Sequence, residues 1–410
     1  MNVELQINSS TNPNARYVTW APSPCRIRVT NPSGATTPLV TVQLTSSSAA
    51  TAGAVVFRAG ITGTFSNSLT VQVPISGNAL TFFVAGRNGR PSVNDGDVTI
   101  EARTGTTLVG SVKLMVRIRK NANNLTAGER DRLVAAFAQL NNQGTGRFAD
   151  FRDMHTNVSS PQAHGPPGFL PWHRAYLLDL ERELQAIDQS VALPYWRFDR
   201  PAPNIFTRDF FGVSNTTGTV QFSATNPLQF WRTDGVPGIS RRPLFNTSAA
   251  PPGLLTEAQT LALGNPGAQY RNFRTMEGNP HGLAHTSFGG WIASIGTAAK
   301  DPLFFLLHCN VDRLWAKWQR QFSRFNPAVA ASYDSNPSNP PGHNLPDTMW
   351  PWNGVTGGTR PPTAPGGTLA SSPIATGPGP QPPVQSCLDY QGTLGGGNRM
   401  GFDYDDVPFA

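Results

Sequence analysis

The first part of the chain alternates short apolar runs with clusters of polar turn residues. In one run, Val112, Leu114 and Val116 alternate with Lys113 and Arg117 on the opposite face, as expected of a strand with one buried side. Regular short strands with turns between them predict an antiparallel β-sandwich of unknown role over residues 1–120. The runs that carry this prediction are Leu39–Leu44, Val55–Phe57, Leu69–Val73, Leu80–Val84, Val98–Ala102 and Leu108–Ile118.

After residue 120 the apolar spacing changes from that of strands to that of helices. Thr126 and Glu129 have the spacing of a capping box. In this motif, the side chain of each residue accepts a hydrogen bond from the backbone N–H of the other residue. The apolar residues that follow at helical intervals are Leu133, Val134, Phe137 and Leu140. A helix is therefore predicted to begin just after Thr126.

Three more helices are predicted in the same part of the chain. One covers residues 171–187, one begins near Asn279 and Pro280, and one begins at Asp301 and Pro302. Asn or Asp followed by Pro is a common start, because the side chain caps the helix and the proline lacks an amide that the first turn cannot use. These helices predict a mainly α, four-helix-bundle domain over residues 121–410.

Residues 326–386 are rich in Pro, Gly, Asn, Ser and Thr. This composition predicts a long surface excursion, either packed on the bundle or partly mobile.

The overall composition excludes several classes of function. Net charge is +7, but charged residues make up 14% of the chain and form no long run, so we expect no nucleic-acid partner. No apolar stretch is long enough to span a membrane. Cys25, Cys309 and Cys387 form no CxxC pair or disulfide framework. The N-terminus shows no secretory signal, which favours a cytoplasmic location unless processing has removed one; the oligomeric state is not indicated.

The seven histidines carry the chemistry. Two groups of three are His155, His164 and His173, and then His281, His285 and His308. His281 and His285 are four residues apart, which places both rings on one side of a helix. Histidines on helices that face each other can converge in a bundle core, so each trio could hold one metal ion. His343 lies in the Pro-rich excursion, and we expect it on the surface.

The ligand type narrows the choice of metal. Imidazole suits zinc, copper, iron and nickel. Zinc proteases need a glutamate directly after the first histidine of the pair, where this chain has Gly282. Iron oxygenases usually combine two histidines with a carboxylate. Two sites made of neutral imidazoles favour a redox-active pair of copper ions.

Several stretches resemble the copper signatures of the tyrosinase and polyphenol oxidase family, across residues 121–405. They are His164–Arg174, Glu277–His285 and Asp301–Trp315, with further landmarks at Pro194–Trp196 and Phe402–Tyr404. The resemblance implies a binuclear type 3 copper site, with the first trio of histidines on one copper and the second trio on the other. It implies an enzyme that uses O2 to oxidise o-diphenols (catechols) to o-quinones, with or without hydroxylation of monophenols, so small phenols and O2 are the expected partners.

The resemblance also assigns roles to residues around the copper ions. Glu277 falls on a glutamate that orients a water near the substrate. Phe304 matches a phenylalanine that packs beside the copper ions, although ordinary helix core explains it equally well. Asp312, one turn after His308, either orients an imidazole or forms a surface ion pair with Arg313.

The sequence departs from the family pattern at three positions. Many members have asparagine where this chain has Gly282, which puts monophenol hydroxylation in doubt because glutamate and asparagine together would hold the catalytic water. Gln162 replaces a cysteine that some members link to a histidine, so no thioether is expected. The usual His-His pair is Leu307–His308, which keeps the ligand. Because the sequence ends soon after Tyr404, we expect no C-terminal shielding domain.

Three alternatives stay open. The enzyme could act on o-aminophenols, the site could bind O2 reversibly as in molluscan haemocyanin, or the chain could be a binding protein without metal. A single catalytic unit without a cap disfavours the oxygen carrier, and the complete set of ligands disfavours the third reading.

Overall fold

The computed structural model describes residues 1–33, 37–395 and 399–409, and its contacts divide the chain into two compact units. The β unit comprises residues 1–118, 372–376 and 391–410, and the helical unit comprises residues 119–371 and 377–390. The sequence placed everything after residue 120 in the helical domain, so the assignment of residues 372–376 and 391–410 to the β unit is a correction.

Hydrogen bonds within the β unit explain why the C-terminal segment belongs to it. The Trp20 indole donates to the carbonyl of Tyr404 at 2.8 Å, and the backbone N–H of Ala21 donates to the Asp403 carboxylate at 3.1 Å. The Phe402–Tyr404 landmark, which the sequence placed in the helical domain, is therefore held by Trp20 and Ala21 of the β unit.

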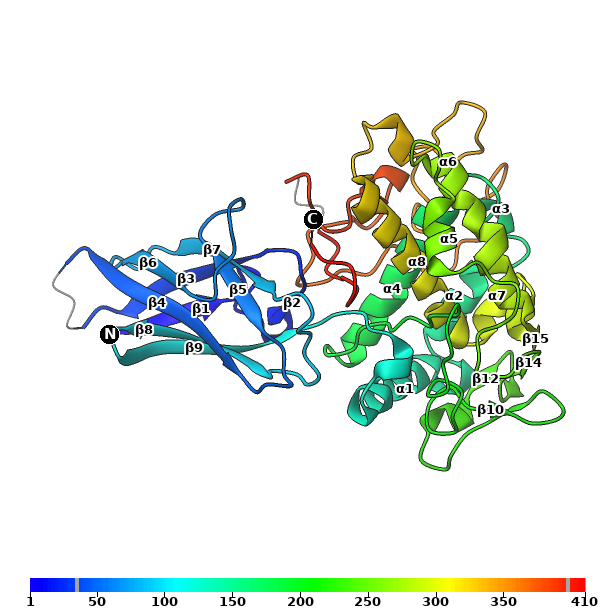
Figure 1. The fold of residues 1–410 in the computed structure, drawn as a ribbon, viewed down its shortest axis with the longest axis horizontal. Coiled ribbons are helices and arrows are strands. Elements are labelled where there is room, and N and C mark those ends of the chain that lie inside the picture. The colour runs from blue at the N-terminus through cyan, green and yellow to red at the C-terminus, as the bar shows by residue number, and fades with distance from the viewer. Residues whose placement is uncertain (34–36, 396–398, 410) are drawn as a thin grey trace. The chain divides into compact units, whose positions relative to one another are not determined.

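Two sheets form the main body of the β unit (Figure 1). The four-stranded sheet contains, in spatial order, β1 (Asn2–Gln6), β3 (Ser23–Asn31), β7 (Leu80–Gly86) and β5 (Val55–Arg58). The five-stranded sheet contains β2 (Tyr17–Val18), β9 (Thr107–Val116), β8 (Val98–Thr104), β4 (Leu39–Ser48) and β6 (Leu69–Pro74). All pairings are antiparallel except that of β2 with β9. Alternate apolar side chains from both sheets, such as Ile27 and Leu44, fill one shared core.

Eight α-helices are described in the helical unit. They are α1 (Ala127–Asn141), α2 (Phe148–Met154), α3 (Ser160–Ala163), α4 (Phe169–Ile187), α5 (Glu257–Ala262), α6 (Tyr270–Phe273), α7 (Leu283–Thr286) and α8 (Leu303–Phe322). The predicted capping box starts α1, with Thr126 and Glu129 bonded reciprocally. The long helices α4 and α8 pack on each other, and α1 packs on α4.

The third predicted helix is not one long element. The chain passes from α6 through the 3-10 turn Arg274–Glu277 and the π turn Gly278–Gly282 into the four-residue α7. Asn279 has φ −140° and ψ 120°, outside the helical region, because a residue before proline is sterically disfavoured there. An extended residue is usual just before a helix, so a helical segment begins at Pro280 as expected and carries His281 and His285. It ends at Thr286, which is too short for the long helix of a regular four-helix bundle.

The connection between α4 and α8 contains three short two-stranded ladders. They pair β10 (Val213–Ser214) with β11 (Val220–Gln221), β12 (Arg232–Thr233) with β13 (Val236–Pro237), and β14 (Arg241–Pro243) with β15 (Phe288–Gly290). Arg241 forms a buried two-point ion pair with Asp301, whose carboxylate also accepts the backbone N–H of Leu303 at the start of α8.

The Pro-rich residues 326–371, which we call the strap, pack on the helical unit. The Trp172 indole donates to the carbonyl of Trp350 at 2.6 Å, and the Trp352 indole donates to Asp179 at 2.8 Å. Both strap tryptophans are buried. Residues 326–371 of the expected excursion thus pack on the helices, whereas residues 372–376 belong to the β unit.

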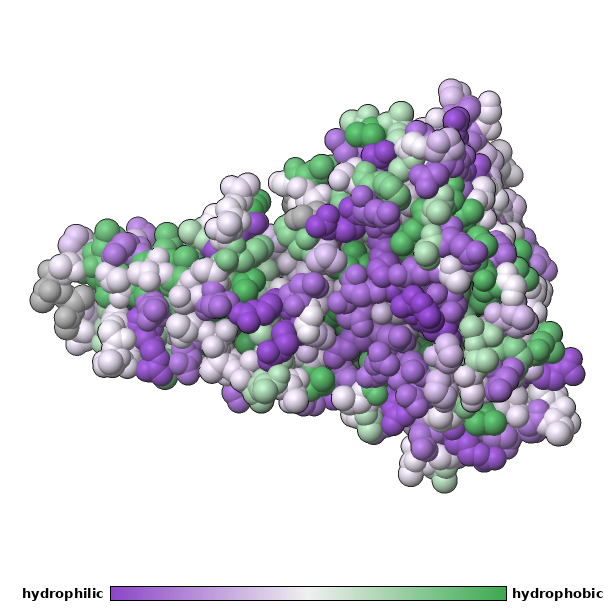
Figure 2. Space-filling model, viewed as in Figure 1, coloured by the Kyte–Doolittle hydropathy of each residue, from purple (hydrophilic) through white to green (hydrophobic). Residues whose placement is uncertain are grey.

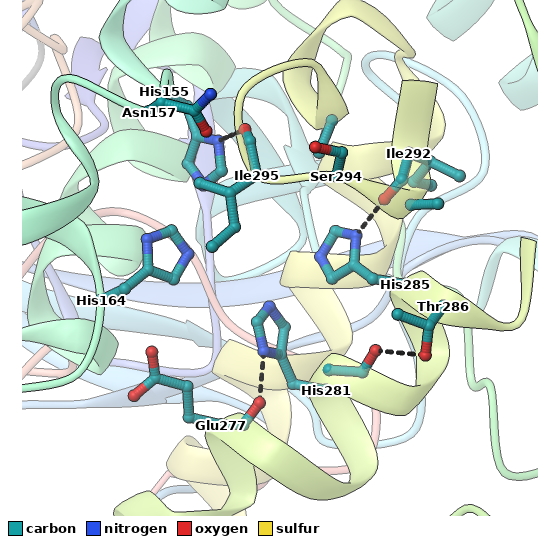
Figure 3. Close-up of a pocket in the computed structure, with 13 residues that line it drawn as sticks. His155, Asn157, His164, Glu277, His281, His285, Thr286, Ile292, Ser294 and Ile295 are labelled. Carbon is teal, nitrogen blue, oxygen red and sulfur yellow. Dashed lines mark hydrogen bonds between the residues drawn. The ribbon is translucent and has the colours of Figure 1, made fainter. Parts of the chain in front are cut away.

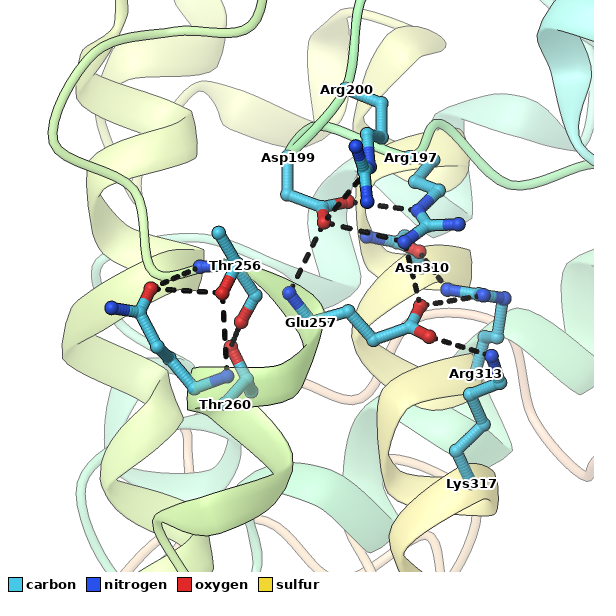
Figure 4. Close-up of polar contacts among 10 residues, drawn as sticks. Arg197, Asp199, Arg200, Thr256, Glu257, Thr260, Asn310, Arg313 and Lys317 are labelled. Carbon is cyan, nitrogen blue, oxygen red and sulfur yellow. Dashed lines mark hydrogen bonds and ion pairs between the residues drawn. The ribbon is translucent and has the colours of Figure 1, made fainter.

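An ion cluster ties α5 to α8 (Figure 4). Glu257 at the start of α5 accepts from Arg313 and from Lys317, each at 2.7 Å, and its own backbone N–H donates to Asp199 at 3.1 Å. Figure 2 shows hydrophilic residues gathered over the helical unit on the face where α5 and α8 lie in Figure 1. Within the part of the chain that is described, no helix has the length and apolar character needed to cross a membrane.

Candidate metal centre

The six predicted histidines meet in the helical unit as two groups. Within each group, the nitrogens available as ligands lie within 4.8 Å of one another; the groups are His155, His164 and His173, and His281, His285 and His308. The first group comes from the ends of α2 and α3 and from α4. The second comes from the π turn, α7 and α8. Residues distant in the sequence thus converge as the spacing predicted.

Backbone carbonyls orient four of the six imidazoles. In each of these four rings, Nδ1 lies within hydrogen-bond distance of a backbone carbonyl oxygen. The pairs are His155 with the carbonyl of Ile295 at 3.1 Å, His173 with that of Phe169 at 2.9 Å, His281 with that of Glu277 at 2.7 Å, and His285 with that of Ile292 at 2.7 Å. A carbonyl can only accept, so Nδ1 carries the proton and Nε2 presents its lone pair. The Nε2 atoms of His155 and His173 are buried with no hydrogen-bond partner among the described residues, as befits metal ligands.

Contacts between rings join the two groups into one site. The rings of His173 and His308 stack with centroids 4.2 Å apart and planes 13° apart. In the second group, the Nε2 of His308 lies 3.2 Å from that of His281 and 3.1 Å from that of His285. Lone pairs that converge in this way suit a shared cation, so the donor set fits one metal ion in each group.

Electrostatics keep these imidazoles in the form that binds metal. Burial lowers the pKa of every one of the six, and neighbouring histidines lower it further for all of them except His285. The pKa of His164 falls to about 4, mainly through burial, and that of His285 also falls to about 4 for the same reason. At neutral pH the rings are therefore uncharged ligands, which suits copper or zinc.

A cavity of about 490 Å³ opens onto both groups (Figure 3). Its lining residues are His155, Asn157, His164, Glu277, His281, Gly282, His285, Thr286, Ile292, Ala293, Ser294, Ile295 and Ala298. The volume is within the range of small-molecule sites. Two residues singled out from the sequence, Glu277 and Gly282, line this cavity.

The Glu277 carboxylate lies at the cavity wall beside His164 and His281 (Figure 3). It accepts the backbone N–H of Gly165 at 2.9 Å. Burial raises its pKa, while the Gly165 amide and the nearby Arg274 act in the opposite direction. The sequence identified this residue through the resemblance, and the structure places it where it can reach a bound molecule.

Gly282 and Phe304 occupy different positions relative to the cavity. A side chain built on Gly282 would place its Cβ 3.3 Å from the carbonyl oxygen of Glu277, with no other close contact. Phe304 is buried and does not line the cavity. Its ring packs against His308 at 4.1 Å and His155 at 4.7 Å, so it supports ligands from both groups.

Two expectations about residues near the site are wrong. Asp312 is buried, yet it does not orient the ring of its neighbour one turn away, since the Nδ1 of His308 has no hydrogen-bond partner among the described residues. Instead Asp312 pairs with Arg174 at 2.6 Å and with Arg119 at 3.3 Å, because these guanidinium groups are buried beside it. Because Asp312 and Arg313 are both buried, the expected ion pair at the surface is also wrong; Arg313 pairs with Glu257 at 2.7 Å.

The expectation that His343 is a surface residue is also wrong. Its side chain is buried, and both ring nitrogens bond to backbone atoms of the segment around His164. Gln162 is buried nearby and accepts from Arg360 at 2.6 Å. Leu307 is fully buried in α8 beside the ligand His308.

Several cavity residues had no signal in the sequence. Asn157, Thr286 and Ser294 bring uncharged polar groups to the cavity, and Ile292 and Ile295 contribute carbonyls to ligand rings. A carbonyl oxygen is common to every residue type, so only the path of the backbone reveals this role.

Comparison with known proteins agrees with the geometry. A family model described as the common central domain of tyrosinase matches residues 145–321. A tyrosinase of Streptomyces antibioticus is 35% identical over 271 residues, covering 58% of this chain and 94% of that protein. Grixazone synthase of Streptomyces griseus is 31% identical over 266 residues, covering 50% and 85%. A solved functional unit of octopus haemocyanin has a TM-score of 0.47 and 21% identity, covering 72% and 69%.

The chain belongs to the tyrosinase family. It is a tyrosinase-type polyphenol oxidase with a binuclear copper cofactor, and its two histidine trios fit that cofactor.

Proposed function

We propose that this enzyme oxidises o-diphenols to o-quinones with molecular oxygen, and that it acts poorly on monophenols. The observation that carries the proposal is the pair of histidine trios that share one open cavity. Oxidation of a pair of catechols to o-quinones releases four electrons and four protons, which convert one O2 to a pair of waters. When bound, the copper ions would supply the route by which those electrons pass.

The chain's own residues prepare the cavity for this reaction. The neutral imidazoles leave their Nε2 lone pairs to copper, and the carbonyls of Ile292 and Ile295 fix two of the rings. Glu277 is the single carboxylate that lines the cavity within the described part of the chain. Because burial raises its pKa, it is suited to take a proton from a substrate hydroxyl, directly or through a water.

Gly282 supports the preference for catechols over monophenols. Hydroxylation of a monophenol requires removal of the phenolic proton before oxygen is inserted, and a water held by a carboxylate and an amide is a suitable base. Glu277 supplies the carboxylate, but Gly282 has no side chain to supply the amide.

The test is a steady-state comparison of 4-methylcatechol with 4-methylphenol on copper-loaded protein. We expect rapid, chelator-sensitive oxidation of the catechol and slow turnover of the monophenol. The variant Gly282→Asn should raise the monophenol-to-catechol ratio of kcat by about tenfold or more. Gly282→Ala is the matched control, since it adds the Cβ without the amide. Comparable wild-type rates on both substrates would contradict the proposal.

An o-aminophenol and a reversible O2-binding measurement belong in the same panel. The cavity of about 490 Å³ leaves room for an aromatic ring beside the histidines, which favours an enzyme over an oxygen carrier. Faster turnover of the aminophenol than of the matched catechol would show that o-aminophenols, and not catechols, are the substrate class. Reversible oxygenation without catechol turnover would show that the protein is an oxygen carrier and not an oxidase.

A further inference from the structure

His164 differs from most of the other ligands in how its ring is held. Its Nδ1 has no hydrogen-bond partner among the described residues, whereas four of the other rings are fixed by carbonyls. Its side chain is also only partly buried. The direction of this imidazole therefore depends on the backbone that carries it, residues 161–168, which we call the His164 loop.

His343 bonds to both ends of the His164 loop. The carbonyl of Pro161 lies 2.8 Å from its Nε2, and the backbone N–H of Gly168 donates to its Nδ1 at 3.2 Å. An amide only donates and a carbonyl only accepts, so these partners fix a neutral ring with its proton on Nε2. A Cβ on Gly168 would lie 2.4 Å from the Nδ1 of His343, so this close approach requires glycine.

The strap holds His343 in place. The Tyr333 hydroxyl donates to the carbonyl of His343 at 2.9 Å. The backbone N–H groups of Gly342 and Asn344, on either side, donate to one oxygen of Asp347 at 2.9 and 3.0 Å. Such fixed partners on both sides make the imidazole a rigid support rather than a mobile side chain.

We propose that His343 is a positioning residue for the first copper ion. It contacts no ligand itself; it holds the loop that brings His164 to His155 and His173, in place of the ring hydrogen bond that His164 lacks. The proposal rests on the family's copper cofactor and does not depend on which phenol is oxidised. Loss of the support should loosen the first trio and leave the second intact.

The test compares His343→Leu, His343→Asn and His343→Gln by copper content and by the rate of copper release to a chelator. Leucine removes both bonds. Asparagine places an acceptor near the Nδ1 position and keeps the bond to Gly168, and glutamine places a donor near the Nε2 position and keeps the bond to Pro161. The matched control is Arg182→Met, which removes bonds to the strap carbonyl of Ala370 and to Gly377, away from the loop.

For His343→Leu we expect one of the bound copper ions to leave about tenfold faster or more, the size typical of a lost contact behind a metal ligand. The Asn and Gln variants should fall between wild type and Leu. The melting temperature of the copper-free protein should fall by a similar amount in His343→Leu and in the control. The rise in melting temperature that copper binding causes should be smaller than in wild type for His343→Leu alone.

Two results would overturn the proposal. One is unchanged copper release in the Asn and Gln variants, which are polar enough to fold even if the Leu variant does not. The other is equal loss of both copper ions in every variant and in the control, which would mean that the strap merely stabilises the fold.

Discussion

Removing the charge of Asp312 should destabilise the helical unit strongly. Asp312 on α8 belongs to a buried network of balanced charge that joins α4, α8 and the start of the helical unit; its members are Arg119, Arg174, Glu181 and Asp312. The side chains of the two arginines are 0% exposed and that of Asp312 is 1% exposed. Water therefore cannot replace a lost partner.

The structure sets the size of the effect. In Asp312→Asn, the remaining oxygen can still accept from Arg174, but the new amide N–H groups would face Arg119, which has only donors. The network would be left with one uncompensated positive charge in the interior. Breaking a buried ion pair by removing one partner costs about 3 to 5 kcal/mol, a large share of the stability of a typical domain.

The assay is urea unfolding followed by tryptophan fluorescence. Eight of the nine tryptophans lie in the helical unit, so this signal follows that unit even if the two units unfold separately. With a slope of about 3 kcal/mol per molar urea, we expect the midpoint of Asp312→Asn to fall by about 1 M or more. The control is Asp150→Asn in α2, where the partner is Arg147 and the carboxylate is 39% exposed; it should change stability by about 1 kcal/mol at most.

Equal and small shifts in the two variants would refute the reasoning. That result would mean that the Arg119 and Arg174 charges are already solvated, and that the buried network does not hold α4 against α8.

Three further outcomes are expected. His308→Ala should lower bound copper from close to two ions per chain, one for each trio, to close to one, with unchanged helical circular dichroism; full copper content would mean that the ligand is misassigned. Burial raises the pKa of Asp403 to about 6, so the folded protein takes up this proton at higher pH than the unfolded chain does. The stability contributed by this group is then present at acidic pH and is lost as the pH rises through about 6, by about 3 kcal/mol at most. Asp403→Asn should therefore gain stability relative to wild type between pH 5 and pH 7 in urea unfolding followed by β-sheet circular dichroism, and a pH-independent difference would contradict this. Finally, no Lys or Arg is found among the cavity-lining residues that the structure describes. At low salt, kcat/KM for a catechol with a carboxylate side chain should therefore be about tenfold below kcat/KM for a catechol with an ammonium side chain. A reversed order would mean that a cation outside the lining binds substrate.

Elements with strong local signals could be predicted from the sequence. The capping box of Thr126 and Glu129 starts α1 where expected, because its chemistry involves neighbouring residues alone. The expected apolar runs form β4 to β9. The histidine trios could also be predicted, since the spacing of His281 and His285 fixes one side of a helical turn.

Two other elements were not predicted as they are. In β3, the buried Cys25, Ile27 and Val29 alternate with Arg26 and Arg28, which is the same pattern that marks β9, so this strand could have been predicted from the sequence. The helix expected near Asn279 and Pro280 begins there but ends at Thr286, and the Asn279 side chain bonds to the backbone of Leu255 and Gly253 instead of capping the helix.

The role of His343 depends on tertiary contacts. A histidine among prolines and glycines is usually exposed, and the bonds of His343 go to the distant backbone of Pro161 and Gly168. Backbone partners leave no side-chain pattern to detect. The same holds for the carbonyls of Ile292 and Ile295 that orient ligand rings.

The most direct measurement of the central claim is the metal content of purified, copper-loaded protein by mass spectrometry, after dialysis against buffer without metal. Two trios of neutral imidazoles on one cavity predict close to two copper ions per chain. A reproducible single zinc ion per chain, or no retained metal, would contradict the account.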